Sequence, residues 1–365
     1  YSVLTVDTLL GAYVIGLVPG LLLAGGLSDR FGRRPVMLAG TTLSLLASAL
    51  LAVGERGPGW LAAGRFLTGV AVAVAMAVGS TWVKELSDRE PDSVADRGTG
   101  RAALCLTLGL GVGPGVAGVL AQWGPMPMVL PYLVHLLLVA TVLPVLRRSP
   151  ETGSRAGSSV RLGVVRLGVV RHPRFRRVIV PMAPWVFGSA GVAYAIMPQL
   201  VGDRVGHWGL AYSTLLTVCT LGAGTLVQPL ARRLDRQTSA RGVVVGMIVM
   251  SLGLAASAVA AALRSPWLAL GAAVVLGAAY GIAVLSGLLE LQRLAPPEEL
   301  AGLIGVYYAL AYLGFLVPSL LAVLSEVASY PVLLVGLAVV AFSGTLLIVR
   351  HSRAHLPILA EPVAS

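Results

Sequence analysis

The sequence predicts an all-α protein that crosses a membrane many times. Apolar runs of about 20 residues recur along the chain, and this is the length that a helix needs to cross the hydrocarbon core of a bilayer. Only 12% of the 365 residues are charged and 56% are hydrophobic, whereas an average soluble domain has about 25% charged residues. A core of ordinary size does not need so much apolar sequence, so we expect a polytopic membrane protein.

Eleven spans are predicted from the apolar runs. Gly and Pro lie inside several of the runs, as is common in membrane helices. The predicted spans are residues 8–27, 36–53, 60–83, 102–121, 126–146, 178–200, 209–230, 241–263, 267–289, 300–324 and 330–349.

The loops between these spans alternate between strongly basic and nearly uncharged. Because basic loops mark the cytoplasmic side of a membrane protein, the net charge of +11 is interpreted as a signal of orientation, with the tail at 350–365 in the cytoplasm. The clusters lack the aromatic or groove-reading partners of a nucleic-acid interface, so no nucleic-acid partner is expected. Lys84 is the sole lysine, a usage that points to a GC-rich bacterial genome and hence to a bacterial inner membrane.

The longest basic loop, residues 147–177, divides the chain into an N-terminal half at 1–146 and a C-terminal half at 178–349. It carries the pentapeptide RLGVV twice. Two interpretations remain open, a plain basic connector and a short segment that lies on anionic lipid.

An internal repeat relates the two halves. Asp29 in Leu27-Ser28-Asp29-Arg30 stands 203 residues before Arg232 in Leu230-Ala231-Arg232-Arg233, and Pro114 in LGLGVGP stands 204 residues before Pro318 in LGFLVP. Agreement between two landmarks predicts a parallel duplication. Shifting the span at 178–200 back by this length places a helix before residue 1, so we expect two six-helix halves of which eleven spans are present.

The loop after the first span resembles the signature loop between helices 2 and 3 of the major facilitator superfamily; its residues are Gly25, Leu27, Ser28, Asp29, Arg30, Gly32, Arg33 and Arg34. Three further segments are similar to that family: Arg65 in LAAGRFLTGV, the run Gly109, Gly113, Pro114, Ala117 and Gly118, and Pro150-Glu151-Thr152. The glycine-proline run resembles the helix-5 motif of the proton-driven efflux branch, with Ala117 in place of a usual Gly. The resemblance implies a twelve-helix transporter with a central cavity and alternating access.

Within the signature loop, Gly32 supplies backbone freedom at the turn and Gly25 is expected to allow close helix contact. Asp29 is expected to contact an arginine of its own loop and the positive N-terminal end of the helix near 300–302, which would latch the cytoplasmic gate. The resemblance implies that Glu85 pairs with Arg30 or Arg33. The alternative is a loop that only sets orientation, with incidental ion pairs.

Arg65 lies inside a span, where charges are costly and often functional. It is a candidate for substrate binding or for proton coupling, and the alternative is an arginine that extends to the outer interface. In the efflux motif, Pro114 is expected to kink its helix, while Gly109, Gly113 and Gly118 admit a close neighbour. By resemblance this kink seals the cavity against leak; a generic tight crossing is the alternative.

No Asp or Glu stands in the middle of a predicted span. His135 is central in its span and titrates near neutral pH, so it is a coupling candidate, although a packed or lipid-adjacent histidine is the alternative. The coupling acid is otherwise expected in the helix before residue 1, or proton coupling does not occur. The candidate cavity residues are Trp185, Tyr194, Gln199, Tyr308 and Tyr312; the alternative for these is an aromatic belt at the interface.

The sequence shows no nucleophile motif, metal-ligand spacing or phosphate-binding loop, so neither an enzyme nor a cofactor is expected. We expect a monomeric secondary transporter in the lipid bilayer that exports a small amphipathic compound in exchange for protons. An importer or facilitator of a sugar or other metabolite is the alternative, and the complete lack of Asn weakens it. A membrane sensor would need a soluble output domain, and the sequence has none.

Overall fold

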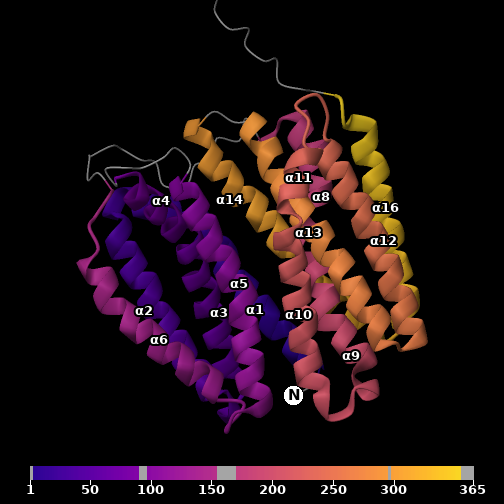
Figure 1. Ribbon diagram of the computed structural model, residues 1–365, viewed down its shortest axis with the longest axis horizontal. Helices are drawn as coiled ribbons and strands as arrows, with labels where there is room; N and C mark the ends of the chain where they lie inside the picture. Colours follow the sequence, from indigo (N-terminus) through magenta and orange to yellow (C-terminus); the bar gives the residue numbers. More distant parts are fainter. Residues whose placement is uncertain (1–2, 90–96, 154–169, 295–296, 355–365) are drawn as a thin grey trace, which may run out of the picture.

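The computed structural model describes residues 3–89, 97–153, 170–294 and 297–354. Within these ranges the regular secondary structure is helical, apart from one isolated bridge between Arg236 and Ser239, and turns connect the helices. Its long helices run roughly parallel, in two groups that lie side by side in Figure 1. We call them the N-terminal bundle, drawn in indigo to magenta, and the C-terminal bundle, drawn in rose to yellow.

The N-terminal bundle contains α1 (Val3–Phe31), α2 (Arg33–Ala52), α3 (Pro58–Val74), α4 (Ser80–Asp88), α5 (Arg97–Trp123) and α6 (Leu130–Arg148). A π-helical segment, Ala75–Gly79, joins α3 to α4, so that residues 58–88 form one long rod. Proline at the start of α3 and near the start of α6 suits the first turn of a helix, where the backbone N–H has no partner in the helix.

The C-terminal bundle contains α8 (Val180–Gly191), α9 (Met197–Val201), α10 (Gly209–Leu226), α11 (Gln228–Leu234), α12 (Arg241–Leu263), α13 (Pro266–Leu294), α14 (Pro297–Leu313), α15 (Leu316–Leu324) and α16 (Tyr330–His351). π-Helical segments at Phe175–Ile179 and Val192–Ile196 flank α8. Gly314 and Phe315 interrupt the rod between α14 and α15.

Ten helices of the described residues are long and apolar enough to cross a membrane. They coincide with ten of the eleven predicted spans. The remaining predicted span, 102–121, lies within the 27-residue α5, whose side chains fall in part outside the described residues. The predicted connector at 147–177 lies outside the described residues between 154 and 169.

One end of the bundles, at the top of Figure 1, carries the signature loop, and we call it the basic end; the opposite end, where α1 begins, is the far end. At the basic end of the C-terminal bundle lies a fully buried arginine. Arg174 donates two hydrogen bonds to Glu290, at 2.7 and 3.0 Å, and further ones to the carbonyls of Ser352 and Ala354. This pair fixes the start of the α8 rod against the end of α13 and the segment after α16.

Removing the Glu290 charge should destabilise the protein far more than removing an exposed one. In Glu290→Gln the buried Arg174 loses its counter-charge, and breaking a buried pair costs about 3–5 kcal/mol in the free energy of unfolding. Thermal unfolding in detergent measures this loss. The control is Asp203→Asn, whose ion pair with Arg264 is about half exposed and should contribute about 0–1 kcal/mol; equal shifts in the two variants would contradict a structural role for the buried pair.

Candidate functional site: a charged hub and an aromatic cluster

Arg33 lies at the centre of a charged hub at the basic end. Its guanidinium donates to Glu85 at 3.0 Å, to Ser28 at 2.8 Å and to Asp29 at 2.5 Å. Ser28 and Asp29 end α1, while Glu85 belongs to α4. One side chain, only 15% exposed, therefore joins three helices, because Arg33 itself begins α2.

The one-residue turn between α1 and α2 depends on glycine. Gly32 has φ +98°, a conformation that residues with a Cβ rarely adopt, and its N–H donates to the carbonyl of Ser28. A Cβ at this position would also meet the carboxylate of Glu151. The turn thus holds Arg33 close enough to Asp29 and Glu85 to bind both.

Glu151, just after α6, caps the N terminus of α2. Its carboxylate accepts hydrogen bonds from the backbone N–H groups of Arg33 at 2.8 Å, Arg34 at 3.0 Å, Thr152 at 3.0 Å and Gly153 at 2.9 Å. Partial burial by itself would raise the pKa of Glu151, but these four donors outweigh it and hold that pKa below its usual value. The negative charge also opposes the positive end of the α2 dipole.

The segment at 150–152 ties α6 to α4 as well. The carbonyl of Pro150 accepts from the indole N–H of Trp82 at 3.1 Å, and the Thr152 hydroxyl donates to Glu85. Arg89 donates to the carbonyls of Glu151 and Thr152, both at 3.2 Å. Sequence reasoning noticed this segment only as a family likeness and missed its cap, because Glu151 stands 118 residues from Arg33.

The remaining arginines of the signature loop play smaller parts. Arg30 is exposed and lies over the ring of Phe31, with 5.2 Å from its guanidinium carbon to the ring centre. Arg34 donates weakly to the carbonyl of Arg147 at 3.5 Å. Of the two partners expected for Glu85, the structure places Arg33 against it. The helix start near 300–302, expected beside Asp29, has side chains outside the described residues.

An aromatic cluster lies where the two bundles meet. Phe187 of α8 stacks on Tyr312 and on Phe315, with ring centres 4.3 and 4.9 Å apart. Tyr13 of α1 meets Tyr312 and Phe315 edge to face, at 6.5 and 6.4 Å. Tyr194 lies 6.5 Å from Phe315. The cluster therefore joins α1 of one bundle to α8, α14 and the break after α14 in the other.

Breaks in two helices lie beside this cluster. Phe315 sits in the gap between α14 and α15, and Tyr194 sits in the π-helical segment at 192–196. Gly314 packs so closely on the backbone of Pro184 and Gly188 that any Cβ would collide with it. Irregular turns of this kind leave a helix able to bend at that point.

Two of the five predicted cavity residues, Tyr194 and Tyr312, belong to the cluster. Tyr308 instead packs on Tyr307, at 5.5 Å between ring centres, and Trp185 lies near Gly344 of α16, inside the C-terminal bundle. Gln199 is exposed in α9 at the far end. Sequence reasoning missed Tyr13, Phe187 and Phe315, since an apolar aromatic residue within a span carries no sign of the neighbour it faces.

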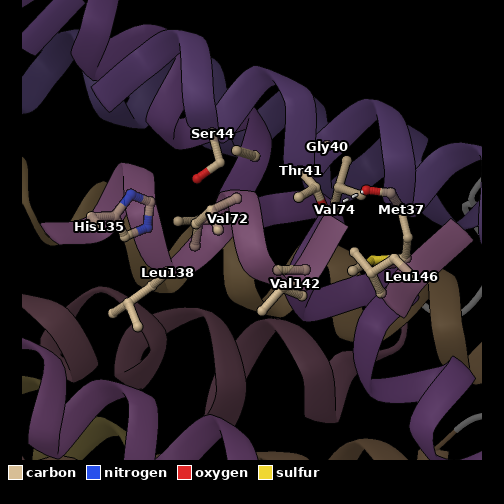
Figure 2. A pocket seen from close by; sticks show the side chains of 13 residues that line it. Met37, Gly40, Thr41, Ser44, Val72, Val74, His135, Leu138, Val142 and Leu146 are labelled. Carbon is tan, nitrogen blue, oxygen red and sulfur yellow. Dashed lines mark hydrogen bonds between the residues drawn. The ribbon is translucent and has the colours of Figure 1, made fainter. Parts of the chain in front are cut away.

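The two ionisable candidates within spans occupy different places. Arg65 is exposed on α3, the helix whose Gly69 packs on the backbone of Tyr13 in α1. His135 is exposed on α6, and its Nδ1 shares a hydrogen bond of 2.8 Å with the hydroxyl of Ser48 on α2. His135 also lines a pocket between α2, α3 and α6, shown in Figure 2.

The glycine-proline run in α5 contacts the C-terminal bundle through the part nearer the far end. A Cβ on Gly118 would collide with Thr214 of α10, and one on Gly115 would touch Val218. The structure differs from expectation at Gly25, Gly109 and Gly113, which have no neighbour within 4 Å of a Cβ position. Gly25 lies near the basic end of α1, Gly109 at the middle of α5, and Gly113 four residues farther toward the far end. Pro114 lies within α5 without ending it.

Other contacts between the bundles also lie toward the far end. The side chain of Gln122 donates to the carbonyl of His207 and accepts from the N–H of Ala211, while Trp123 lies 6.1 Å from Trp208 between ring centres. Near the middle of the helices the Tyr312 hydroxyl points to the sulfur of Met76, and nearer the basic end Gly305 touches Leu22.

Known proteins share both the sequence and the shape of this chain. The sequence profile described as Major Facilitator Superfamily matches residues 1–319. The multidrug transporter MdfA of Shigella boydii serotype 4 and that of Escherichia coli O157:H7 are each 26% identical over 310 residues, which cover 80% of this chain and 70% of the relative.

Solved structures agree with this match at the level of fold. A D-xylose-proton symporter aligns with TM-score 0.71 at 15% identity, over 98% of this chain and 89% of the other. The nucleoside transporter NupG aligns with TM-score 0.72 at 13% identity, over 95% and 91%. The human organic anion transporter MFSD10 aligns with TM-score 0.66 at 19% identity, over 93% and 83%.

These matches agree with the bundle of membrane helices described above. The family consists of membrane transporters of small molecules and not of enzymes. The chain is a multi-pass membrane protein that belongs to the Major Facilitator Superfamily.

Proposed function

We propose that this protein exports small amphipathic compounds across a bacterial inner membrane, in exchange for protons and by alternating access. The observation that carries the proposal is the aromatic cluster of Tyr13, Phe187, Tyr194, Tyr312 and Phe315 between the bundles. Rings with few charges suit a cargo that has a large apolar surface. The charge of Arg65, on the helix α3 that packs on α1 at Tyr13, adds one group able to orient a polar or anionic substituent.

The names of the related proteins support export more than import. The matched relatives with the higher identity are multidrug transporters. Structural neighbours that carry xylose or nucleosides favour the alternative, an importer of a polar metabolite. An importer of that kind would need several amide and acid groups around its cargo, and this chain has no Asn at all.

The position of the contacts suggests which state the structure represents. The bundles touch from the far end up to the contact of Gly305 with Leu22, while Gly25, Gly109 and Gly113 have room on their free faces. In an alternating-access cycle the basic ends would approach each other in the other state. Small residues at those positions permit such an approach. With the basic loops in the cytoplasm, the present state faces inward, and the C terminus is cytoplasmic.

The charged hub would act as a latch in that other state. Here all its described members belong to the N-terminal bundle, and Asp29 is 47% exposed despite its bond to Arg33. We infer that its carboxylate then meets the positive N-terminal end of α14. Arg33, Glu85 and Glu151 would hold Asp29 in place, and Arg30 and Arg34 would set orientation. Exchange for protons is part of the proposal because the α5 motif resembles that of proton-driven exporters.

We further propose a monomer built of two repeated halves, with the basic connector at 147–177 between them. In this arrangement α5 is an additional membrane span, and its contact with α10 through Gly118 closes the far end. Neither nucleic acid nor a cofactor takes part. The energy for export would come from the ion gradient.

Asp29→Asn should slow transport while the protein remains folded in the membrane. Losing the carboxylate weakens the latched state, and about 1.4 kcal/mol of lost stabilisation corresponds to a tenfold slower turnover. Turnover in inverted vesicles measures it, with Asp203→Asn at the far end as the matched control. Unchanged turnover in Asp29→Asn would exclude the latch.

Gly25→Leu should block the approach of the basic ends without harming the present state. A leucine has room here, so thermal stability should stay within about 0.5 kcal/mol, the usual range for an uninvolved surface position, while turnover falls at least about tenfold. Gly336→Leu on α16, also without a neighbour within 4 Å, is the control. A loss of activity equal in both variants would show that bulk at an open glycine is harmful by itself.

Purified protein in proteoliposomes should transport amphipathic compounds in exchange for protons that run down an imposed gradient. A panel of a lipophilic aromatic cation, a neutral aromatic compound, xylose and a nucleoside distinguishes the two candidate functions, and a pH-sensitive dye reports proton movement. Export predicts flux of the aromatic compounds that stops when an ionophore collapses the gradient. Flux of xylose or nucleoside alone, or flux indifferent to the gradient, would favour the importer or facilitator.

A further inference from the structure

A pocket of about 410 Å³ lies on the outer side of the N-terminal bundle, between α2, α3 and α6. Its size is within the range of about 300–1,000 Å³ that is usual for small-molecule sites. None of the residues of α6 is buried, and Leu138 and Val142 are exposed. The pocket is therefore reached from the lipid side, and it is separate from the aromatic cluster between the bundles.

The structure holds this pocket open by fastening its walls at both ends. At the basic end, Glu151 after α6 caps the N terminus of α2 through Arg33 and Arg34. Toward the far end, His135 of α6 binds Ser48 of α2. Between the two attachments the helices enclose space, with Gly40 and Ala71 among the small residues that line it.

Two polar side chains mark one end of an otherwise mostly apolar pocket. Figure 2 shows the imidazole of His135 and the hydroxyl of Ser44 at that end, and Met37 and Leu146 at the other. The remaining hydroxyl of the lining, that of Thr41, donates to the carbonyl of Met37 in its own helix. The Nδ1 of His135 is engaged by Ser48, which leaves Nε2 for another partner. A molecule with one polar group and an apolar body matches this arrangement.

The C-terminal bundle offers a natural comparison. A groove of about 710 Å³ lies between α12 and α16, and its lining includes Ser251 and Ala338. These residues stand 203 positions after Ser48 and His135, the offset of the internal repeat. Here the histidine is replaced by alanine, and the hydroxyl of Ser251 is bonded to the carbonyl of Met247 in its own helix. The related groove is thus apolar, as expected for a surface that only contacts lipid chains.

We propose that the pocket between α2, α3 and α6 is a membrane-side binding site for a small amphipathic molecule with a hydroxyl or similar group, which hydrogen-bonds to His135. A hydroxyl both donates and accepts, so it suits either tautomer of the imidazole. The apolar body lies along Val139, Val142 and Leu146. The occupant enters from the bilayer, and its binding is independent of what passes between the bundles.

The test uses the full chain in phospholipid nanodiscs with two photoreactive probes, octanol that carries a diazirine and the matching octane. Peptide mass spectrometry locates the adducts on α2 and α6 and, for comparison, on α12 and α16. We expect the alcohol to label the α2–α6 pocket about fivefold more than the alkane, the worth of one modest hydrogen bond, and unlabelled octanol to compete. The α12–α16 groove should take both probes alike.

Two variants sharpen the result. His135→Leu should remove the preference for the alcohol and leave labelling by the alkane, and Ala75→Phe, which fills the pocket from an exposed position on its wall, should abolish labelling by both probes. Equal labelling of the wild-type pocket by alcohol and alkane would show that lipid chains fill it and would overturn the proposal, as would adducts confined to other surfaces. This comparison needs no variant, so it decides the question even if His135→Leu fails to fold.

Discussion

The N terminus of α2 gathers the interactions on which the basic end of the N-terminal bundle depends. Its free N–H groups and dipole attract a carboxylate, and Glu151 supplies one from the segment just after α6. Because Arg33 is also the first residue of α2, the same position directs a guanidinium toward α1 and α4. Four helices, α1, α2, α4 and α6, are thereby fixed around one helix end.

The C-terminal bundle also has a charge cluster at its basic end, made of different residues. Glu290 and Arg293 stand near the end of α13, 205 and 204 residues after Glu85 and Arg89. Arg293 binds Asp235 and Glu290, while the buried Arg174 binds Glu290 and the carbonyls after α16. A charge cluster at the end of the corresponding helix is thus present in both bundles. In the N-terminal bundle its outer member, Asp29, remains half exposed, and this difference makes that bundle the better place for a contact that forms and breaks.

The helices could be predicted from the sequence because the length of an apolar run is a local property. Charge placement predicts an orientation and repeat spacing predicts a relation between the halves, and both stay predictions. The pairing of Arg33 with Glu85 was one of two arrangements that the loop allowed. The cap by Glu151 and the pair between Arg174 and Glu290 join residues 116 to 118 positions apart, and no local pattern encodes such a meeting. The face of the helix on which each residue lies was equally hidden. Trp185 lies near α16, while Phe187, two residues later, stacks on Tyr312 and Phe315 in the aromatic cluster.

The buried Arg174 has a consequence for how the protein is made. A ribosome releases Arg174 long before Glu290, and the carbonyls of Ser352 and Ala354 follow 178 and 180 residues after it. Until then this guanidinium must remain in water or among lipid headgroups, since an unpaired charge does not enter an apolar interior. The burial of Arg174 therefore waits until the carbonyls of Ser352 and Ala354 have left the insertion machinery. The residues just after α16 thus decide when the first residues of that bundle are finally buried.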